Sequence, residues 1–171
     1  MADGRGVDRR GPRGLVRHGA AIAGGMHHAM AAHISRSGMY NDVAVAIAWL
    51  LGQGTERIAY VDIDAPYSDW EAGRVLGRSG VLTISVRQQP VTLFPFTGLP
   101  AETGGPGAEG SAVNVALSAR SSDAAWLRAF HAVVPPLLAR FWPQIRVSQH
   151  SADTHRRDPL AHCQSAPARQ R

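Results

Sequence analysis

The stretch that decides the fold is RIAYVDI, at residues 57–63. It is short, apolar at most positions and rich in residues that favour β-structure, which predicts an interior strand of a parallel sheet. Three further segments of similar character lie at 81–86, 112–117 and 144–149. Helical patterns alternate with these strands. The alternation predicts an α/β domain whose parallel sheet is covered on both faces.

Two segments carry clear helix signals. Residues 41–51 open with the cap-forming pair Asn41–Asp42 and continue through apolar residues to Gly52, a common stop residue. A second helix is predicted to open at Ser122–Asp123. Because proline lacks a backbone N–H, we expect Pro135–Pro136 to bend or restart that helix.

The positive charge of the chain lies at its two ends. All 18 basic residues among the 171 are arginines, and the formal net charge is +5. Residues 1–18 hold five Arg and two Asp, residues 156–171 hold four Arg and one Asp, and the body between them holds nine Arg and ten acidic residues. A nucleic-acid binder would more often place positive charge on a folded face beside aromatic residues. Specific nucleic-acid binding is therefore not expected. Contact with nucleic acid through the Arg-rich ends is the least favoured of the three functions that the sequence suggests.

We expect one folded domain at residues 19–162. The Gly/Arg-rich segment 1–18 and the tail 163–171 are predicted to be disordered, because they offer little apolar surface to bury. A single cysteine, Cys163, excludes a disulfide framework. The sequence shows neither an apolar run long enough for a membrane helix nor a secretory signal, so we expect a cytoplasmic protein without a membrane partner.

Polar residues follow the ends of the predicted strands, which is the edge where parallel sheets bind ligands. Asp62 and Asp64 lie two residues apart, so their side chains are expected on one side of the chain. Asp153 follows the last strand, and His27–His28 follows a Gly-Gly turn. Together these residues could form a metal or acid–base site, whereas each alone is more often explained as a turn, a cap or a hydrogen-bonded histidine.

The order and spacing of these pieces resemble the zinc-dependent histone deacetylase family, and most closely its bacterial acetoin-utilisation branch. The similarity runs from about Ala20 to His162 and includes AGGMHHAM (23–30), MYNDVAVAIAWLL (39–51), RIAYVDID (57–64), TLFPFTG (92–98) and VSQHSADTHRRDPLAH (147–162). The resemblance implies a partial arginase/deacetylase-type fold, with three αβα layers around a mainly parallel sheet. It also implies zinc-dependent hydrolysis of acetyl-lysine or another small acetyl-amide.

The resemblance implies roles for individual residues. Asp64 and Asp153 match two zinc-binding carboxylates, and in the family the zinc polarises the acetyl carbonyl and activates water. His27 and His28 match tandem catalytic histidines, with His28 as the general base. The remaining matches are the orienting carboxylates Asp62 and Asp69, a potassium site formed by Asp62, Asp64 and Ser85, and the substrate-tunnel positions Phe94 and Ser37.

Departures from the family pattern predict that the activity is impaired or lost. The position of the zinc-binding histidine holds Pro66, whose side chain has no donor atom. Arg36–Gly38 replaces the Gly-Phe-Cys of the tunnel, and Phe96 replaces a glycine. The N- and C-terminal parts of the family domain are also expected to be missing, which would leave sheet edges prone to association or aggregation. The alternative to a deacetylase is therefore a non-catalytic fragment or a binding module.

Overall fold

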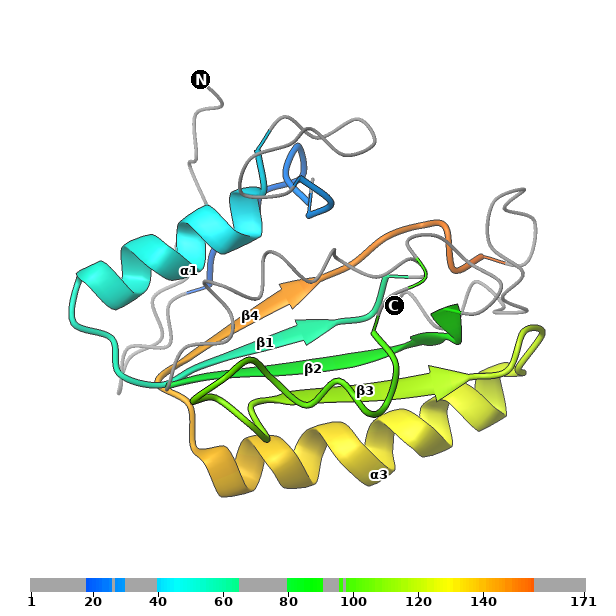
Figure 1. Cartoon of the computed structure of the whole chain (residues 1–171). Helices are drawn as coiled ribbons and strands as arrows, with labels where there is room; N and C mark the ends of the chain where they lie inside the picture. The colour runs from blue at the N-terminus through cyan, green and yellow to red at the C-terminus, as the bar shows by residue number, and fades with distance from the viewer. Residues whose placement is uncertain are drawn as a thin grey trace, which may run out of the picture.

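The computed structural model of the chain describes residues 18–25, 27–29, 40–64, 80–90, 96 and 98–155. These residues form an α/β domain (Figure 1), as expected from the alternating sequence pattern. Its elements, in chain order, are α1 (Asp42–Gly52), β1 (Ile58–Asp62), β2 (Val81–Gln88), β3 (Ala112–Leu117), α3 (Asp123–Phe141) and β4 (Ile145–Gln149).

The four strands form one parallel sheet in the order β3-β2-β1-β4. The first strand in the sequence, β1, therefore lies between β2 and the last strand, β4. This central position explains why all five residues of β1 are buried, and why its sequence is nearly continuous in apolar residues.

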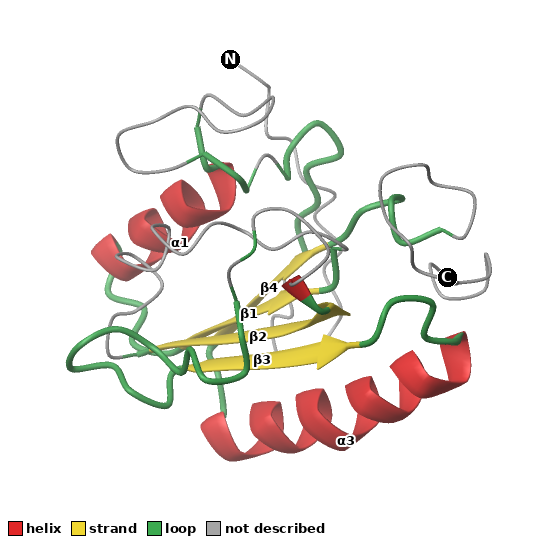
Figure 2. Ribbon diagram, turned by 45° about the vertical axis from the view of Figure 1, so that its right-hand side comes forward, coloured by secondary structure: helices red, strands yellow, loops and turns green. Residues whose placement is uncertain are grey.

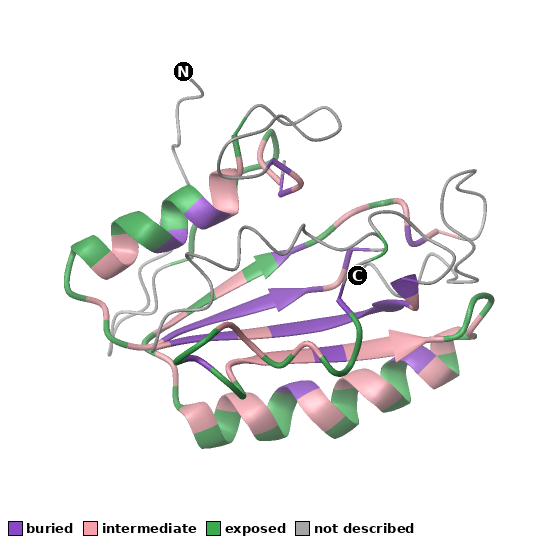
Figure 3. Ribbon diagram, viewed as in Figure 1, coloured by how far each residue is buried: buried purple, intermediate pink, exposed green. Residues whose placement is uncertain are grey.

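The two helices lie on opposite faces of the sheet, which gives three layers (Figure 2). On one face, α3 packs Trp126 and Val134 against Leu82, Ile84 and Val86 of β2. On the other face, the shorter α1 contributes Ala44 and Ile47 to a cluster with Ile58, Tyr60 and Val81. Burial is greatest along β1 and β2 (Figure 3), because these central strands lie between both helical layers.

Both helices start where the sequence predicted. The Asn41 side chain accepts a hydrogen bond from the Ala44 backbone N–H at 2.9 Å, and Ser122 caps α3 in the same way through the Ala125 N–H. Of the predicted bend or restart at Pro135–Pro136, the restart is wrong, because a single helix runs from Asp123 to Phe141. Both prolines are exposed on the outer side of α3, where the missing N–H groups disturb no buried contact.

The face of the sheet beneath α1 changes from apolar to polar along the strands. Near the strand starts, Ile58 is flanked by Val81 on β2 and Ile145 on β4. Two rungs of side chains further on, a continuous polar row crosses all four strands in register: Gln149, Asp62, Ser85 and Asn114. All four residues of this row are buried. The helix α1 covers the apolar half, and the polar half is the floor of the candidate site.

None of the helices among the described residues is long and apolar enough to cross a membrane.

Candidate functional site

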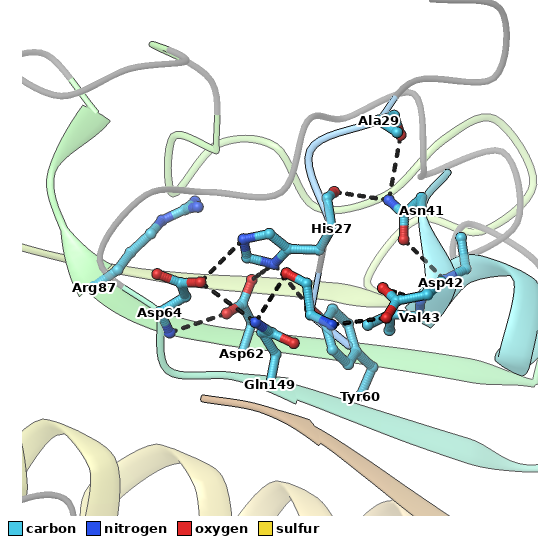
Figure 4. A network of polar contacts seen from close by, with 12 residues as sticks. His27, Ala29, Asn41, Asp42, Val43, Tyr60, Asp62, Asp64, Arg87 and Gln149 are labelled. Atoms are coloured by element: carbon cyan, nitrogen blue, oxygen red, sulfur yellow. Dashed lines mark hydrogen bonds and ion pairs between the residues drawn. The ribbon is translucent and has the colours of Figure 1, made fainter. Parts of the chain in front are cut away.

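The candidate site lies at the carboxyl ends of the strands, where the turn that carries His27 meets the end of β1 (Figure 4). This is the edge at which parallel α/β sheets bind ligands. The site therefore combines residues from the start of the described chain with residues of the central strand. Its buried members are His27, Asp62, Asp64 and Gln149.

His27 lies between two carboxylates. Its Nε2 atom is 3.1 Å from Oδ2 of Asp64, and its Nδ1 atom is 3.5 Å from Oδ2 of Asp62. The imidazole is only 1% exposed. Asp62 also orders its neighbour, because its Oδ1 accepts a hydrogen bond from the Asp64 backbone N–H at 3.0 Å. That turn directs both carboxylates toward the same ring.

The surroundings of His27 favour its protonated form. Burial by itself lowers the pKa of His27, but hydrogen bonds and charges from Asp62 and Asp64 outweigh it and raise the pKa from 6.5 to about 10. Burial by itself raises the pKa of Asp64, but the hydrogen bond and the charge of His27 outweigh it and hold that pKa below its usual value. In this arrangement His27 holds a proton at neutral pH, which makes it a poor general base.

Two further side chains from the sheet orient this cluster. The Tyr60 hydroxyl lies 3.4 Å from Nδ1 of His27, and Tyr60 is itself fixed in the apolar cluster beneath α1. The Gln149 side-chain amide donates to Oδ2 of Asp64 at 3.4 Å and to the Gly25 carbonyl at 3.3 Å. Gln149 therefore connects β4, the turn before His27 and the end of β1.

The start of α1 holds the His27 turn from the other side. The Asn41 amide donates to the His27 carbonyl at 2.7 Å, and the Asp42 carboxylate accepts from the Gly25 N–H at 2.7 Å. Gly25 adopts a φ of +97°, and a Cβ atom there would lie 2.8 Å from the Gln149 amide nitrogen. The φ value favours glycine at this position, and a Cβ atom would also displace the Gln149 amide from its place.

The other two members of the predicted site lie beside this cluster. The ring of His28 contacts that of His27 edge-on, with 4.4 Å between ring centroids. Asp153 is half-buried, and its side chain is close enough to Asp64 to hydrogen-bond it and lower its pKa. The structure thus brings together His27, His28, Asp62, Asp64 and Asp153, from the His turn, the end of β1 and the loop after β4.

A second polar network adjoins the polar row on β2 and β3. The buried Arg87 guanidinium donates to the Gly98 carbonyl at 2.7 Å and to Oδ1 of Asn114 at 3.2 Å. Asn114 in turn donates to the Glu102 carbonyl at 2.7 Å. These bonds attach the loop before β3 to the sheet. Phe96, in the same loop, has a φ of 67°, the left-handed conformation that favours the glycine it replaces in the family pattern.

Several residues named from the sequence lie outside the described residues: Asp69, Pro66, Phe94 and Ser37. Ser85 is described, and it lies beside Asp62 in the register of β1 and β2. Sequence reasoning missed Gln149, Tyr60 and the site-facing role of Asn41. The available signal was a polar residue on the apolar face of a strand, since Gln149 lies two residues after Val147 and therefore on the same face.

The residues that the structure describes do not offer the ligand set of a zinc ion. Catalytic zinc is usually held by three protein ligands and a water molecule. Across the part of the chain that the structure describes, no three His, Cys, Asp or Glu side chains are grouped to hold a metal. Outside the ion pairs of the imidazole, Oδ2 of Asp62, Oδ1 of Asp64 and Nε2 of His27 are buried and have no hydrogen-bond partner among those residues, but these three atoms are not grouped as a ligand set for a metal. Pro66, where the family pattern has its zinc-binding histidine, adds no donor atom.

The fold and the buried His–Asp cluster at the strand ends define an α/β domain of the arginase/deacetylase type. The family model of the histone deacetylase domain matches residues 12–170 of the chain. The chain belongs to the histone deacetylase family.

Two kinds of relative show where the chain lies within this family. It is 34% identical over 149 residues to the acetoin utilization protein AcuC of Bacillus subtilis (strain 168), which covers 87% of this chain and 38% of that relative. Among solved structures, it is similar to an HDAC homolog complexed with SAHA, with 30% identity and a TM-score of 0.79 over 84% of this chain and 39% of that one. An acetylpolyamine aminohydrolase from Burkholderia pseudomallei has 27% identity and a TM-score of 0.72, over 80% of this chain and 40% of that one. The chain thus spans about two-fifths of the length of each.

Proposed function

We propose that this chain is a non-catalytic member of the deacetylase family, in which zinc-dependent hydrolysis of acetyl-lysine or a small acetyl-amide is impaired or lost. The proposal depends on one observation: Pro66 lies where the family pattern has a zinc-binding histidine. Two carboxylates without an imidazole ligand make a poor zinc site, because a lost ligand commonly removes the metal. Among the described residues, no three His, Cys, Asp or Glu side chains are grouped to hold a metal ion, which supports this proposal.

The second candidate is an active deacetylase, because the site keeps several of its expected parts. Asp64 and Asp153 lie within hydrogen-bonding reach of each other, and the His27–His28 pair adjoins them. In that case Asp64 and Asp153 would bind the metal, His28 would act as base, and acetyl-lysine or a small acetyl-amide would be the substrate. A potassium ion at Asp62, Asp64 and Ser85 belongs to the same candidate. We further propose a cytoplasmic protein with one folded domain at 19–162; the segments 1–17 and 163–171 lie outside the described residues.

An acetyl-lysine peptide assay with added Zn²⁺ separates the two candidates. We expect no hydrolysis above background for the unmodified chain. Hydrolysis that disappears in Asp64→Ala and in Asp153→Ala would overturn the proposal and establish the active enzyme. Steeply salt-dependent DNA binding would instead support the third-ranked interpretation, contact through the Arg-rich ends.

Pro66→His tests whether the missing ligand is the principal defect, with Pro66→Ala as its control. Both variants remove the proline ring, but only Pro66→His adds an imidazole. We expect Pro66→His to gain zinc affinity and Pro66→Ala to gain none, as measured by competition with a zinc-binding dye. Equal affinities in the two variants would show that the lost histidine does not explain the inactivity.

A further inference from the structure

The two buried carboxylates of the site need compensation. Asp62 is 2% exposed and Asp64 is 6% exposed, so neither is well solvated. Burying a carboxylate is costly unless it is paired or well hydrogen-bonded. In a metal-dependent enzyme, a divalent cation would supply much of that compensation for ligating carboxylates. The ligand set found here does not provide for such an ion.

The His27 ring is the group that contacts both carboxylates. Nε2 reaches Asp64 at 3.1 Å, while Nδ1 faces Asp62 at 3.5 Å. A single planar ring with a nitrogen on each side can bridge two carboxylates in this way. In Figure 4 a dashed line joins the ring to each of the two carboxylates.

Hydrogen bonds to the backbone of the His27 turn also keep the ring in this position. Asn41 binds the His27 carbonyl at 2.7 Å, and Asp42 binds the Gly25 N–H at 2.7 Å. Gln149 contacts both ends of the arrangement, at the Gly25 carbonyl and at Oδ2 of Asp64. These bonds fix the backbone on both sides of the ring and anchor one of the carboxylates.

We propose that the His27 imidazole compensates the two buried carboxylates of this chain by bridging Asp62 and Asp64, so that the site is ordered without any metal. The inference rests on the proposed function, because it requires that no zinc ion competes for Asp64. It adds a structural role for His27 that is independent of hydrolysis. It therefore predicts properties that can be measured on the protein without a substrate.

The first test uses the unmodified full chain. Imidazole N–H signals are followed by ¹⁵N-edited NMR, and thermal unfolding is recorded, each in EDTA and again with excess Zn²⁺ or Mn²⁺. We expect a His27 N–H protected from solvent and a Tm that neither ion changes. A Tm raised by either ion, together with a shifted or broadened His27 signal, would overturn the proposal.

The second test removes the ring. In His27→Ala the two carboxylates are left buried without their bridge, so we expect Tm to fall by roughly 10 °C. Zn²⁺ or Mn²⁺ should restore part of that loss, because a cation can then enter between the carboxylates. The matched control, His28→Ala, removes the neighbouring imidazole and should show no rescue by either ion. An unchanged Tm in His27→Ala, or equal rescue in both variants, would contradict the bridge.

A double variant keeps the test decisive if His27→Ala fails to fold. His27→Ala/Asp64→Ala removes the ring and also the Asp64 carboxylate, which would be left without its partner in His27→Ala alone. We expect the double variant to fold, and to be more stable than the sum of the single losses predicts. Strict additivity of the losses would overturn the proposal.

The tests also distinguish this inference from the proposed function. Hydrolysis of acetyl-lysine without any response to metal or EDTA would refute the proposed function and leave the His27 bridge standing. Zinc binding at Asp64 without hydrolysis would refute the bridge and leave the chain non-catalytic.

Discussion

The two faces of the sheet use the same strands differently. Beneath α3, side chains at alternate positions are apolar from one end of the strands to the other, as in Leu82, Ile84 and Val86. Beneath α1, the pattern starts apolar with Ile58 and Tyr60 and becomes polar at Asp62. The covering helices differ in the same sense, since α3 has 19 residues and α1 has 11.

Within one sheet, the face beneath α3 mainly stabilises the fold, whereas the face beneath α1 carries the polar side chains of the candidate site. The long helix α3 covers its face along a continuous apolar core, and that core stabilises the strands irrespective of the site. The short helix α1 leaves the carboxyl ends of the strands to the buried polar row. A change on the α3 face should therefore alter the free energy of unfolding alone, whereas a change on the site face should also alter its pH dependence.

The largest expected effect is on the α3 face. Ile84 is fully buried between β2 and α3, so Ile84→Ala should cost about 2–5 kcal/mol through lost contacts and a cavity. Its neighbour Ser85 points to the site face, and Ser85→Ala should cost about 1 kcal/mol. Urea unfolding of both variants measures the difference. Equal losses would mean that the two faces do not differ as described.

The site face should show a pH dependence with a defined sign. His27 has a pKa raised from 6.5 to about 10, so its contribution to stability is complete below pH 6.5 and is lost as the pH rises to about 10. Asp64 has a lowered pKa, so its contribution is present above pH 3.8 and is lost on acidification. We expect the free energy of unfolding to fall by a few kcal/mol, in order of magnitude, between neutral pH and pH 10.

The control for this pH profile is His27→Gln, which should flatten the fall above neutral pH. Ile84→Ala should keep the slope of the unmodified chain, because it lies on the other face. The absence of lysine helps this measurement, since no lysine ammonium titrates near the upper end of that range. A slope that survives in His27→Gln would assign the pH dependence to another group.

The two helix caps provide a smaller comparison of the same kind. Ser122 accepts one bond at the start of α3, whereas Asn41 caps α1 and also donates to the His27 carbonyl at 2.7 Å. We expect Ser122→Ala to cost about 1 kcal/mol and Asn41→Ala about 2 kcal/mol. Chemical denaturation gives both values. A loss in Asn41→Ala no greater than in Ser122→Ala would show that the tie to the His27 turn adds nothing.

The smallest effect is a gain. Phe96 is 64% exposed at a φ of 67°, so Phe96→Gly should relieve backbone strain at little loss of burial and stabilise the chain by about 0.5 kcal/mol. Trp142 is a matched position far from the site, because it is 74% exposed at a φ of 53° after the end of α3. Trp142→Gly should give a similar gain. A loss in Phe96→Gly alone would mean that the aromatic ring holds the loop before β3.

Much of the fold could be predicted from the sequence because its signals are local. The interior strand at 57–63 and the cap at Asn41 depend on residues adjacent in the chain, and the structure has both within a residue or two. The restart of α3 at Pro135–Pro136 was a wrong prediction, since exposure on the outer side lets a helix tolerate a missing donor.

The candidate site could be predicted only in part. His27, Asp62 and Asp64 are visible in the sequence as polar residues at turns and strand ends. The contribution of Gln149 depends on the pairing of β4 beside β1, which local patterns do not specify. Tyr60 likewise has the sequence features of an ordinary strand residue, and only the structure shows that its hydroxyl lies beside His27.

The contact between Gln149 and Gly25 joins residues that are 124 positions apart in the chain. Such distant pairings form late in folding, because a long loop must close before they contribute. During synthesis, the apolar clusters of α1, β1 and β2 are complete in the chain well before β4 emerges. We therefore expect the His27 turn to complete its contacts only when the last strand docks, so that a variant that slows the docking of β4 should delay the ordering of His27 more than the collapse of the core.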